Sequence, residues 1–213
     1  MIKSEIRSLI INLLPKLDKT GKYHPRFIDA AIEKVINEMY NNVYKRNPLE
    51  LMRYTEGYGY TTALPVLSEA STGIYYTTLP SAIVPFPDKA SGVRRVSTMV
   101  QGGMKFFPID KREIELLLDN SNVNYVTSKI GYLVTPDRVE FYNLSGAVLG
   151  AGVRMDLIIP FSSYSDTDVV LLPEEVDPQG QTFVDKVLKT LSVIQPMDAV
   201  DNNADIKQTG NGQ

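Results

Sequence analysis

The stretch that decides the fold is PRFIDAAIEKVINEMYNNVYKR, residues 25–46. Its apolar residues recur at intervals of three and four, the spacing that places side chains on one face of an α-helix. Pro25 suits the first helical turn, where its missing N–H costs nothing, and Pro48 helps to end the helix. The sequence therefore predicts a helix of roughly 20 residues, about 30 Å long. Its buried stripe is Ile28, Ala31, Ile32, Val35, Met39 and Val43.

The same periodicity occurs near both ends of the chain. Residues 2–14 precede Pro15 and carry an apolar face of Ile2, Ile6, Leu9, Ile10, Leu13 and Leu14. Residues 183–194 precede Pro196 and carry Phe183, Val184, Val187, Leu188, Leu191 and Ile194. Asp177, followed by Pro178, is the predicted N-cap of this last helix. These helices can bury their apolar faces only against each other or against partners.

Between these helices the pattern changes to that of β-strands. Strands are predicted over 73–79, 93–100, 104–107, 125–134, 138–144 and 153–161. Gly102-Gly103 predicts a hairpin between the second and third of these strands. A turn at residues 135–137 joins the fourth to the fifth. Asp110 and Glu113 have the spacing of a capping box, which predicts a short helix after residue 110.

We therefore predict an α+β protein, with a helical layer and a long, mainly antiparallel β middle. The layer comprises two N-terminal helices and a C-terminal helix. The predicted boundaries are 1–48 for the N-terminal helices, 49–170 for the mainly β region, 171–196 for the C-terminal helix and 197–213 for a flexible tail. The tail is predicted to be flexible because it is polar and poor in apolar residues.

Composition excludes several kinds of chemistry. The 213 residues include no cysteine, so disulfides, thiolate metal sites and cysteine nucleophiles are excluded. His24 is the only histidine, which excludes a histidine-rich metal site and leaves one candidate base for a Ser–His–Asp triad. We interpret it as a cap or surface residue. No stretch approaches the length of a membrane span, and the net charge of -3 gives no basic field for nucleic acid.

Two local patterns were candidates for a binding or catalytic site. Asp166, Asp168, Glu174, Glu175 and Asp177 form an acidic stretch that could perform acid–base chemistry on a glycan or bind a hard cation. Acidic residues before a helix are also expected from the helix dipole, and we interpret them as structural. Gly57-x-Gly59 and Gly150-x-Gly152 lack the lysine of a phosphate-binding loop. We therefore expect no catalytic residue, metal ligand or cofactor.

Charge is unevenly distributed along the chain. Residues 1–60 carry ten Lys or Arg and seven Asp or Glu, a net charge of +3. Residues 161–213 carry three Lys and nine Asp or Glu, a net charge of -6. The two ends could neutralise each other within one fold, or they could form a contact between copies.

Two further features are candidates for contacts with a partner. Arg94-Arg95 is a basic pair; in a strand one of the two would face out and the other in, or one would lie at an edge. The pair could hold a phosphate or a neighbouring protein, although a simple surface pair is the commoner arrangement. Tyrosines gather at Tyr54, Tyr58 and Tyr60 and again at residues 75–76. Tyrosine suits protein interfaces because it combines a large contact area with a polar tip, and it is equally common in ordinary β-sheets.

Three stretches carry a resemblance to a known family. They are the helix pair at 2–14 and 25–46; YYTTLP at 75–80, followed by VRRV at 93–96 and FPID at 107–110; and DVVLLPE at 168–174, leading into the last helix. In this order they resemble podovirus-type head-to-tail adaptors, the tail tubular protein A-like family, which includes neck ring proteins of crAss-like phages. The resemblance spans most of residues 1–195.

The resemblance implies a non-enzymatic structural protein of the virion. Such adaptors form closed, usually twelve-fold rings beneath the portal and conduct DNA without reading its sequence. The implied partners are other copies of the chain, the portal protein, the next ring or tail protein, and the DNA in the lumen. No membrane is involved. The implied location is the neck between capsid and tail, after synthesis in the host cytoplasm.

The residues we expect at interfaces come from the helical faces, the tyrosines, the basic pair and the acidic stretch. They are Ile28, Val35, Met39, Tyr58, Tyr60, Arg94, Arg95, Glu174, Glu175, Phe183 and Leu188. One alternative function is a phage cell-wall hydrolase, or another virion-associated binding protein, with the hydrolase resting on carboxylates such as Glu174 and Glu175. A nuclease or DNA-binding module is a further alternative, and the balanced charge does not favour it.

Overall fold

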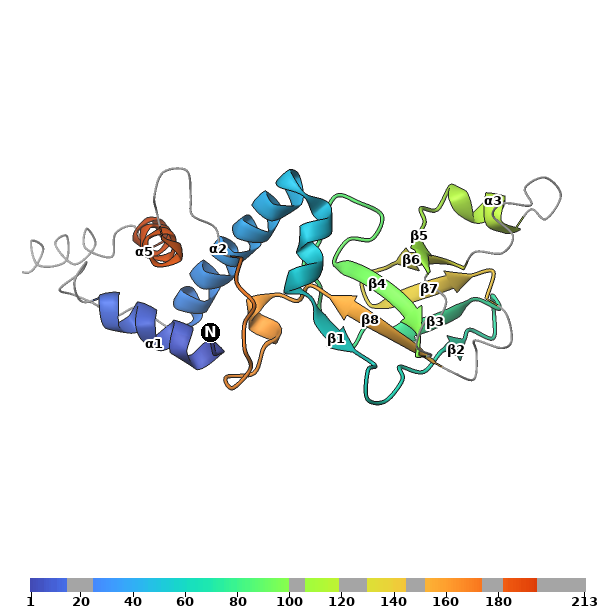
Figure 1. Cartoon of the computed structure of the whole chain (residues 1–213), viewed down its shortest axis with the longest axis horizontal. Helices are drawn as coiled ribbons and strands as arrows, with labels where there is room; N and C mark the ends of the chain where they lie inside the picture. The colour runs from blue at the N-terminus through green and yellow to red at the C-terminus, as the bar shows by residue number, and fades with distance from the viewer. Residues whose placement is uncertain (15–24, 100–105, 119–129, 145–151, 174–181, 195–213) are drawn as a thin grey trace, which may run out of the picture. The chain divides into compact units, whose positions relative to one another are not determined.

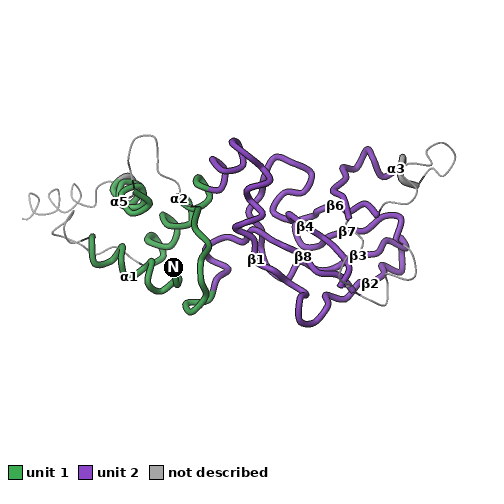
Figure 2. The backbone as a smooth tube through the Cα atoms, in the orientation of Figure 1, with its two compact units in different colours: residues 1–39, 165–213 green, residues 40–164 purple. Residues whose placement is uncertain are grey.

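The computed structural model describes residues 1–14, 25–99, 106–118, 130–144, 152–173 and 182–194. Helices and mainly antiparallel sheets are both present, so the fold is α+β, as predicted (Figure 1). The chain divides into two compact units (Figure 2). Unit 1 comprises residues 1–39 and 165–213, and unit 2 comprises residues 40–164. One boundary falls inside the long helix, and the other falls between Tyr164 and Ser165.

Unit 1 is helical, and its helices begin and end close to where the sequence predicts. They are α1, Lys3–Leu13; α2, Pro25–Arg46, whose last turns belong to unit 2; and α5, Phe183–Ile194. All six residues of the predicted α2 stripe are buried. On α1 the prediction is wrong for Leu9, which is 38% exposed, because the buried line follows Ile6, Ile10 and Leu14.

The start of the chain is tied to residues 166–170. Ile2 forms an antiparallel bridge with Val169, and the amides of Lys3 and Val170 donate to the carbonyls of Asp168 and Met1 at 3.0 and 2.8 Å. Arg7 donates to both carboxylate oxygens of Asp29, at 2.6 and 2.8 Å, and to Asp166 at 2.6 Å. At this point, therefore, the basic start and the acidic end of the chain neutralise each other within one fold.

Unit 2 contains a three-stranded antiparallel sheet in the order β1-β8-β4. Its strands are β1, Glu56–Tyr58; β8, Val153–Leu157; and β4, Val93–Thr98. The predicted strand 153–161 is shorter than expected. Ile158 and Ile159 are buried beyond its end, and the 3-10 helix η3, Phe161–Ser163, follows Pro160. A bulge between Val93 and Arg95 shifts the register of β4.

A five-stranded sheet has the order β2-β3-β7-β6-β5. Its strands are β2, Leu67–Ser68; β3, Tyr75–Thr78; β7, Arg138–Tyr142; β6, Gly131–Val134; and β5, Phe107–Pro108. The predicted antiparallel pair across the turn at 135–137 is confirmed as β6 and β7. Of the Gly150-x-Gly152 fragment, only Gly152 lies within the described residues.

The predicted hairpin between residues 93–100 and 104–107 does not form a paired ladder among the described residues, although the Phe106 amide donates to the Val96 carbonyl at 3.1 Å. β4 pairs with β8, whereas β5 pairs in parallel with β6. Gly102 and Gly103 lie outside the described residues. The β4–β8 ladder sets Val93 and Val96 opposite Leu157 and Met155, and all four side chains are buried. Burial of this apolar set favours the distant partner over the local one.

The two sheets pack into one core in unit 2. The hydroxyl of Tyr132 on β6 donates to the carbonyl of Val93 on β4 at 3.2 Å, and Tyr132 is buried. Phe106 meets Phe141 edge to face, with ring centres 5.5 Å apart. Because a buried hydroxyl needs a partner, the Tyr132 bond fixes the distance between the sheets at this point.

Two short helical elements begin at capping side chains. The 3-10 helix η2, Pro48–Tyr54, was not predicted; Asn47 caps it by accepting from the amide of Leu49 at 3.1 Å. The capping box before α3, Glu113–Leu118, is confirmed by reciprocal bonds between Asp110 and Glu113 of 2.9 and 3.2 Å.

The cap of α5 differs from the prediction. The amide of Thr182 donates to Asp185 at 3.0 Å, and the amide of Asp185 donates to the Thr182 hydroxyl at 3.2 Å. The helix therefore begins directly after Thr182, whereas the predicted cap, Asp177, lies outside the described residues. In the part of the chain that the structure describes, no helix has the length and apolar character to cross a membrane.

Gly59 and Gly73 both have a positive φ, so alanine at either position would strain the backbone, but only at Gly59 would its Cβ also be crowded. A Cβ at Gly59, φ +79°, would lie 2.6 Å from the Val153 carbonyl oxygen, whereas one at Gly73, φ +70°, would meet nothing within 4 Å. We expect Gly73→Ala to lower the free energy of unfolding by about 1 kcal/mol. Gly59→Ala should cost about 1–3 kcal/mol more, because it is also overpacked. Urea unfolding of both variants measures the difference, and equal losses would contradict the crowding at Gly59.

Candidate functional site

Unit 2 holds an open, largely apolar pocket of about 380 Å³ beside η2. Its rim carries Leu49, which is 80% exposed, and Met52, which is 36% exposed. The asparagine cap and the proline at residue 48 start η2, and the 3-10 geometry leaves both side chains pointing away from the core. The lining comprises Pro48, Leu49, Met52, Asp88, Lys89, Ala90, Arg94 and Pro108.

Arg94 contributes a buried charge to the pocket lining. Its side chain is only 7% exposed and donates to the Asp88 carboxylate at 2.8 Å and to the Ser91 carbonyl at 2.6 Å. The guanidinium carbon lies 4.8 Å from the centre of the Phe86 ring and 5.8 Å from that of Tyr44. Burial is the largest effect on its pKa and lowers it, while Asp88 acts in the opposite direction.

The interpretation of Arg94 as part of a surface pair is therefore wrong. The bulge in β4 turns its side chain into the subunit, where the two rings and Asp88 enclose it. A guanidinium suits such a place because it can stack on aromatic rings while its donors reach a carboxylate. Its two terminal nitrogens donate to Asp88 and Ser91 and its Nε is buried without a partner, so it is poorly placed to take a phosphate.

Lys89 connects the pocket rim to the cap of α3. Its ammonium lies 2.5 Å from Glu113 and 3.5 Å from Asp110. The hydrogen bond from Lys89 is the largest cause of the lowered pKa of Glu113, and backbone hydrogen bonds and Lys89 together lower the pKa of Asp110 against the effect of burial. These carboxylates are therefore acceptors for a cap and a lysine, with little basicity left for proton abstraction.

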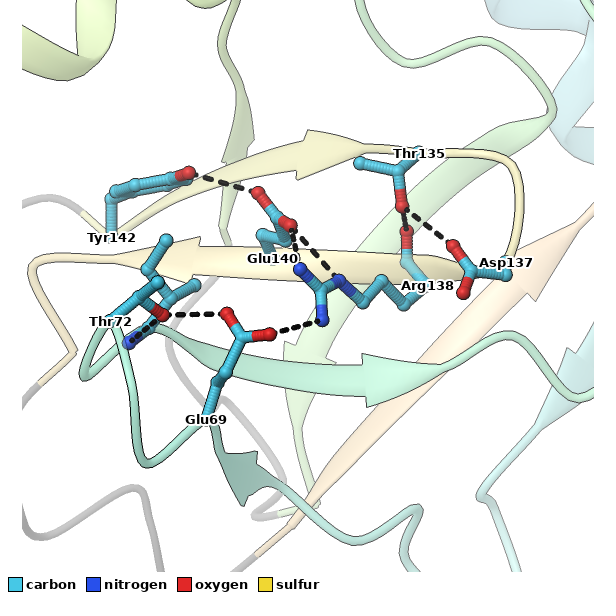
Figure 3. Close-up of polar contacts among 8 residues, drawn as sticks. Glu69, Thr72, Thr135, Asp137, Arg138, Glu140 and Tyr142 are labelled. Atoms are coloured by element: carbon cyan, nitrogen blue, oxygen red, sulfur yellow. Dashed lines mark hydrogen bonds and ion pairs between the residues drawn. The ribbon is translucent and has the colours of Figure 1, made fainter.

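A second polar network lies on the five-stranded sheet (Figure 3). Arg138 on β7 reaches Glu140 at 2.7 Å and Glu69 at 3.4 Å, and its guanidinium stacks on the Tyr76 ring at 4.9 Å. Glu69 accepts from the Thr72 hydroxyl at 2.6 Å, and Glu140 accepts from the Tyr142 hydroxyl at 2.9 Å. The network joins a loop, β3 and β7, and each carboxylate is matched by a donor.

These networks hold their carboxylates in fixed pairs with cations and hydroxyl donors. Among the described residues, no three His, Asp or Glu side chains gather closely enough to hold a metal ion. The pocket offers apolar contact with charges at its margin, a combination that is common in ligand-binding pockets.

The structure distributes the predicted interface residues over different environments. Ile28, Val35 and Met39 are buried in the chain itself, so they serve its own core. Phe183 and Leu188 are half-buried on α5. Tyr58 is half-buried on β1, and Tyr60 is 46% exposed beyond it. Glu174 and Glu175 lie outside the described residues, as does His24.

Sequence reasoning missed the pocket. Leu49 and Met52 stand after Pro48 without helical or strand periodicity, so no pattern marked them as exposed apolar residues. The sequence does carry one sign of η2. Asn47 is a residue type favoured as a helix cap, and Pro48 is favoured in the first turn, so the pair could have indicated a short helix after residue 47.

No protein-family model matches the chain, and no curated protein matches its sequence.

Replacing Arg94 tests whether it holds unit 2 together. Arg94→Met keeps the side-chain length but leaves Asp88 without its cation. We expect a loss of about 2 kcal/mol, below the ~3–5 kcal/mol of a fully buried pair because Asp88 keeps some contact with water. Arg53→Met, on an arginine that is 77% exposed, is the control and should cost at most about 0.5 kcal/mol. Chemical denaturation of both variants gives the comparison, and equal losses would refute the role.

Tyr142 should titrate late in alkali. Burial first, and then the hydrogen bond to Glu140, raise its pKa to about 12 from an ordinary value of 10. The neutral phenol is therefore favoured in the folded state, and its contribution to stability is complete below pH 10 and disappears as the pH rises through 12. A ¹³Cζ NMR titration, assigned with Tyr142→Phe, measures the midpoint. In Glu140→Gln the pKa should fall part of the way, and a wild-type midpoint near 10 would contradict the arrangement.

Proposed function

We propose that this chain is a structural subunit of a tailed-phage virion that forms a ring at the neck, connects the portal to the tail and lines the DNA conduit. The observation that carries the proposal is how the described polar side chains are used. The clusters around Arg7, Lys89, Arg94 and Arg138 link elements of the subunit to one another. Such pairing is expected of a component whose task is to hold a shape.

The order of elements supports the identification of the ring. Two N-terminal helices, a β region and a closing helix follow one another as in the podovirus-type adaptors that the sequence resembles. The α1 and α5 helices both belong to unit 1 and contact each other, so the first and last described helices lie in one helical unit. The β region forms its own compact unit, which gives a subunit two separately packed parts for two kinds of contact.

A closed ring needs two different faces on each subunit, because each copy contacts its neighbours heterologously. The buried α2 stripe is not available for such a contact, so exposed side chains must supply it. The proposed partners are other copies in a twelve-fold ring, the portal, the next ring or tail protein, and the DNA of the lumen. The proposed location is the virion neck, and the proposed role is mechanical rather than enzymatic.

Solution mass tests this function directly. The 23.8-kDa subunit should be a monomer alone and should enter a large closed ring when mixed with its portal, as measured by light scattering coupled to gel filtration. Portal alone and an unrelated phage's portal are the controls. If the protein keeps the mass of a monomer with every candidate portal, the proposed function is wrong.

A further inference from the structure

One face of the three-stranded sheet carries charged side chains. Asp156 on β8 lies opposite Arg95 on β4, and Arg154 lies opposite Ser97. Directly opposed residues, and residues two apart on one strand, share a face of a sheet. All four side chains therefore lie on one face, on which Ser97 and Asp156 are buried and the two arginines are half-buried. The other face carries Val96 and Met155, which belong to the core.

Tyr60 covers part of this charged face. Gly57 on β1 lies opposite Asp156 and has no side chain, and a Cβ there would be 3.0 Å from the Tyr60 ring. The ring occupies that space, and its hydroxyl donates to the Asp156 carboxylate at 2.6 Å. The Arg154 guanidinium lies 5.0 Å from the ring centre. Tyr60 is nevertheless 46% exposed, so a large part of the ring is open to a partner.

The face has one more positive than negative charge. Asp156 is engaged by Tyr60, and Nε of Arg154 donates to the Ser97 hydroxyl at 2.8 Å. Within the described part of the chain, Arg95 forms no salt bridge, and its Nε is buried without a hydrogen-bond partner. Because that Nε is buried, a carboxylate from another molecule would have to bind at the terminal nitrogens of the half-buried Arg95. Arg95, Arg154 and Tyr60 thus form a surface suited to a carboxylate beside an apolar group.

A surface of complementary chemistry exists in unit 1, at residues 165–170. Asp166 is 66% exposed on its side chain and accepts from Arg7 through Oδ1. Asp168 is exposed and accepts from the Ser165 amide through Oδ2, and Val169 is 55% exposed. The bonds to Met1, Lys3 and Arg7 hold this segment in place, so little ordering is required on binding. Hydrogen bonds from Ser165 lower the pKa of Asp168, which keeps that carboxylate charged.

We propose that the sheet face of Arg95, Arg154 and Tyr60 binds the segment 165–170 of a second copy of this chain. The carboxylates would pair with the arginines, and Val169 would pack on the exposed Tyr60 ring. This inference rests on the proposed function, because it supplies the heterologous contact that a ring requires.

DNA fits this face less well than a protein carboxylate does. Duplex binding needs a series of cations spaced along the phosphates, whereas this face has a net charge of one with Asp156 among its arginines. Arginine and tyrosine are, in addition, the residues that protein interfaces favour.

Charge reversal on each surface, and then on both together, tests the contact. The sheet variant combines Arg95→Glu with Arg154→Glu, and the loop variant combines Asp166→Lys with Asp168→Lys. Each should reduce ring formation with portal at least about tenfold, because like charges would meet. A chain that carries all four changes should regain rings, because opposite charges meet again. Gel filtration with light scattering measures the yield of rings.

Two controls separate assembly from folding. Lys111→Glu with Arg112→Glu makes the same change in charge at exposed positions of the same unit and should leave ring yield unchanged. If a reversed variant fails to fold, as judged by thermal unfolding, the neutral versions replace it: Arg95→Gln with Arg154→Gln, and Asp166→Asn with Asp168→Asn. They should weaken assembly in the same direction but less.

The possible outcomes distinguish this contact from the proposed function. If wild type forms rings and both reversals leave them intact, the contact is wrong and the ring function stands. If one reversal abolishes rings and the four-change chain does not restore them, the anion comes from another partner and the contact is again wrong. If the sheet variant loses only binding to a fluorescent DNA duplex, the face binds DNA instead. If the wild-type chain forms no ring with any portal, both the contact and the proposed function are wrong.

Discussion

The β region depends on β8, the one strand that pairs on both sides in the three-stranded sheet. Its apolar residues Val153, Met155 and Leu157 are fully buried. Its polar residues face the other way: Arg154 donates a hydrogen bond to Ser97, and Asp156 accepts one from Tyr60. Alternation in one short strand therefore separates a core from a charged surface. A shift of one residue in its pairing would exchange the two, which is why both ladders must specify the register.

The helices could be predicted from sequence because their signal is local. The limits of α2 and α5 follow from periodicity over neighbouring residues and from the prolines around them. The α3 capping box is equally local, since Asp110 and Glu113 lie within one turn. The same reasoning gave the β6–β7 pair, whose strands are joined by a short turn.

The strand partners and the site could not be predicted in this way. β4 pairs with a strand far along the chain, and nothing between residues 93 and 107 distinguishes that ladder from a local hairpin. Arg94 and Arg95 are neighbours in sequence but lie in different environments. The bulge sends Arg94 into a cage of Phe86, Tyr44 and Asp88, while Arg95 stays on the sheet face. Strand alternation predicts that one of the two arginines faces inward, but which one does so, and against which side chains, depends on tertiary packing.

The pairing of Glu56 with Leu157, and of Ile2 with Val169, has a consequence during synthesis. A ribosome releases the first helix and β1 long before it makes the segments that complete them. Neither compact unit can close until nearly all of its chain has emerged, so folding is delayed by contacts between distant residues. Until then, apolar strands such as β4 are without their partners. During this time, the unpaired strands of one nascent chain can pair wrongly with those of other chains being translated from the same mRNA.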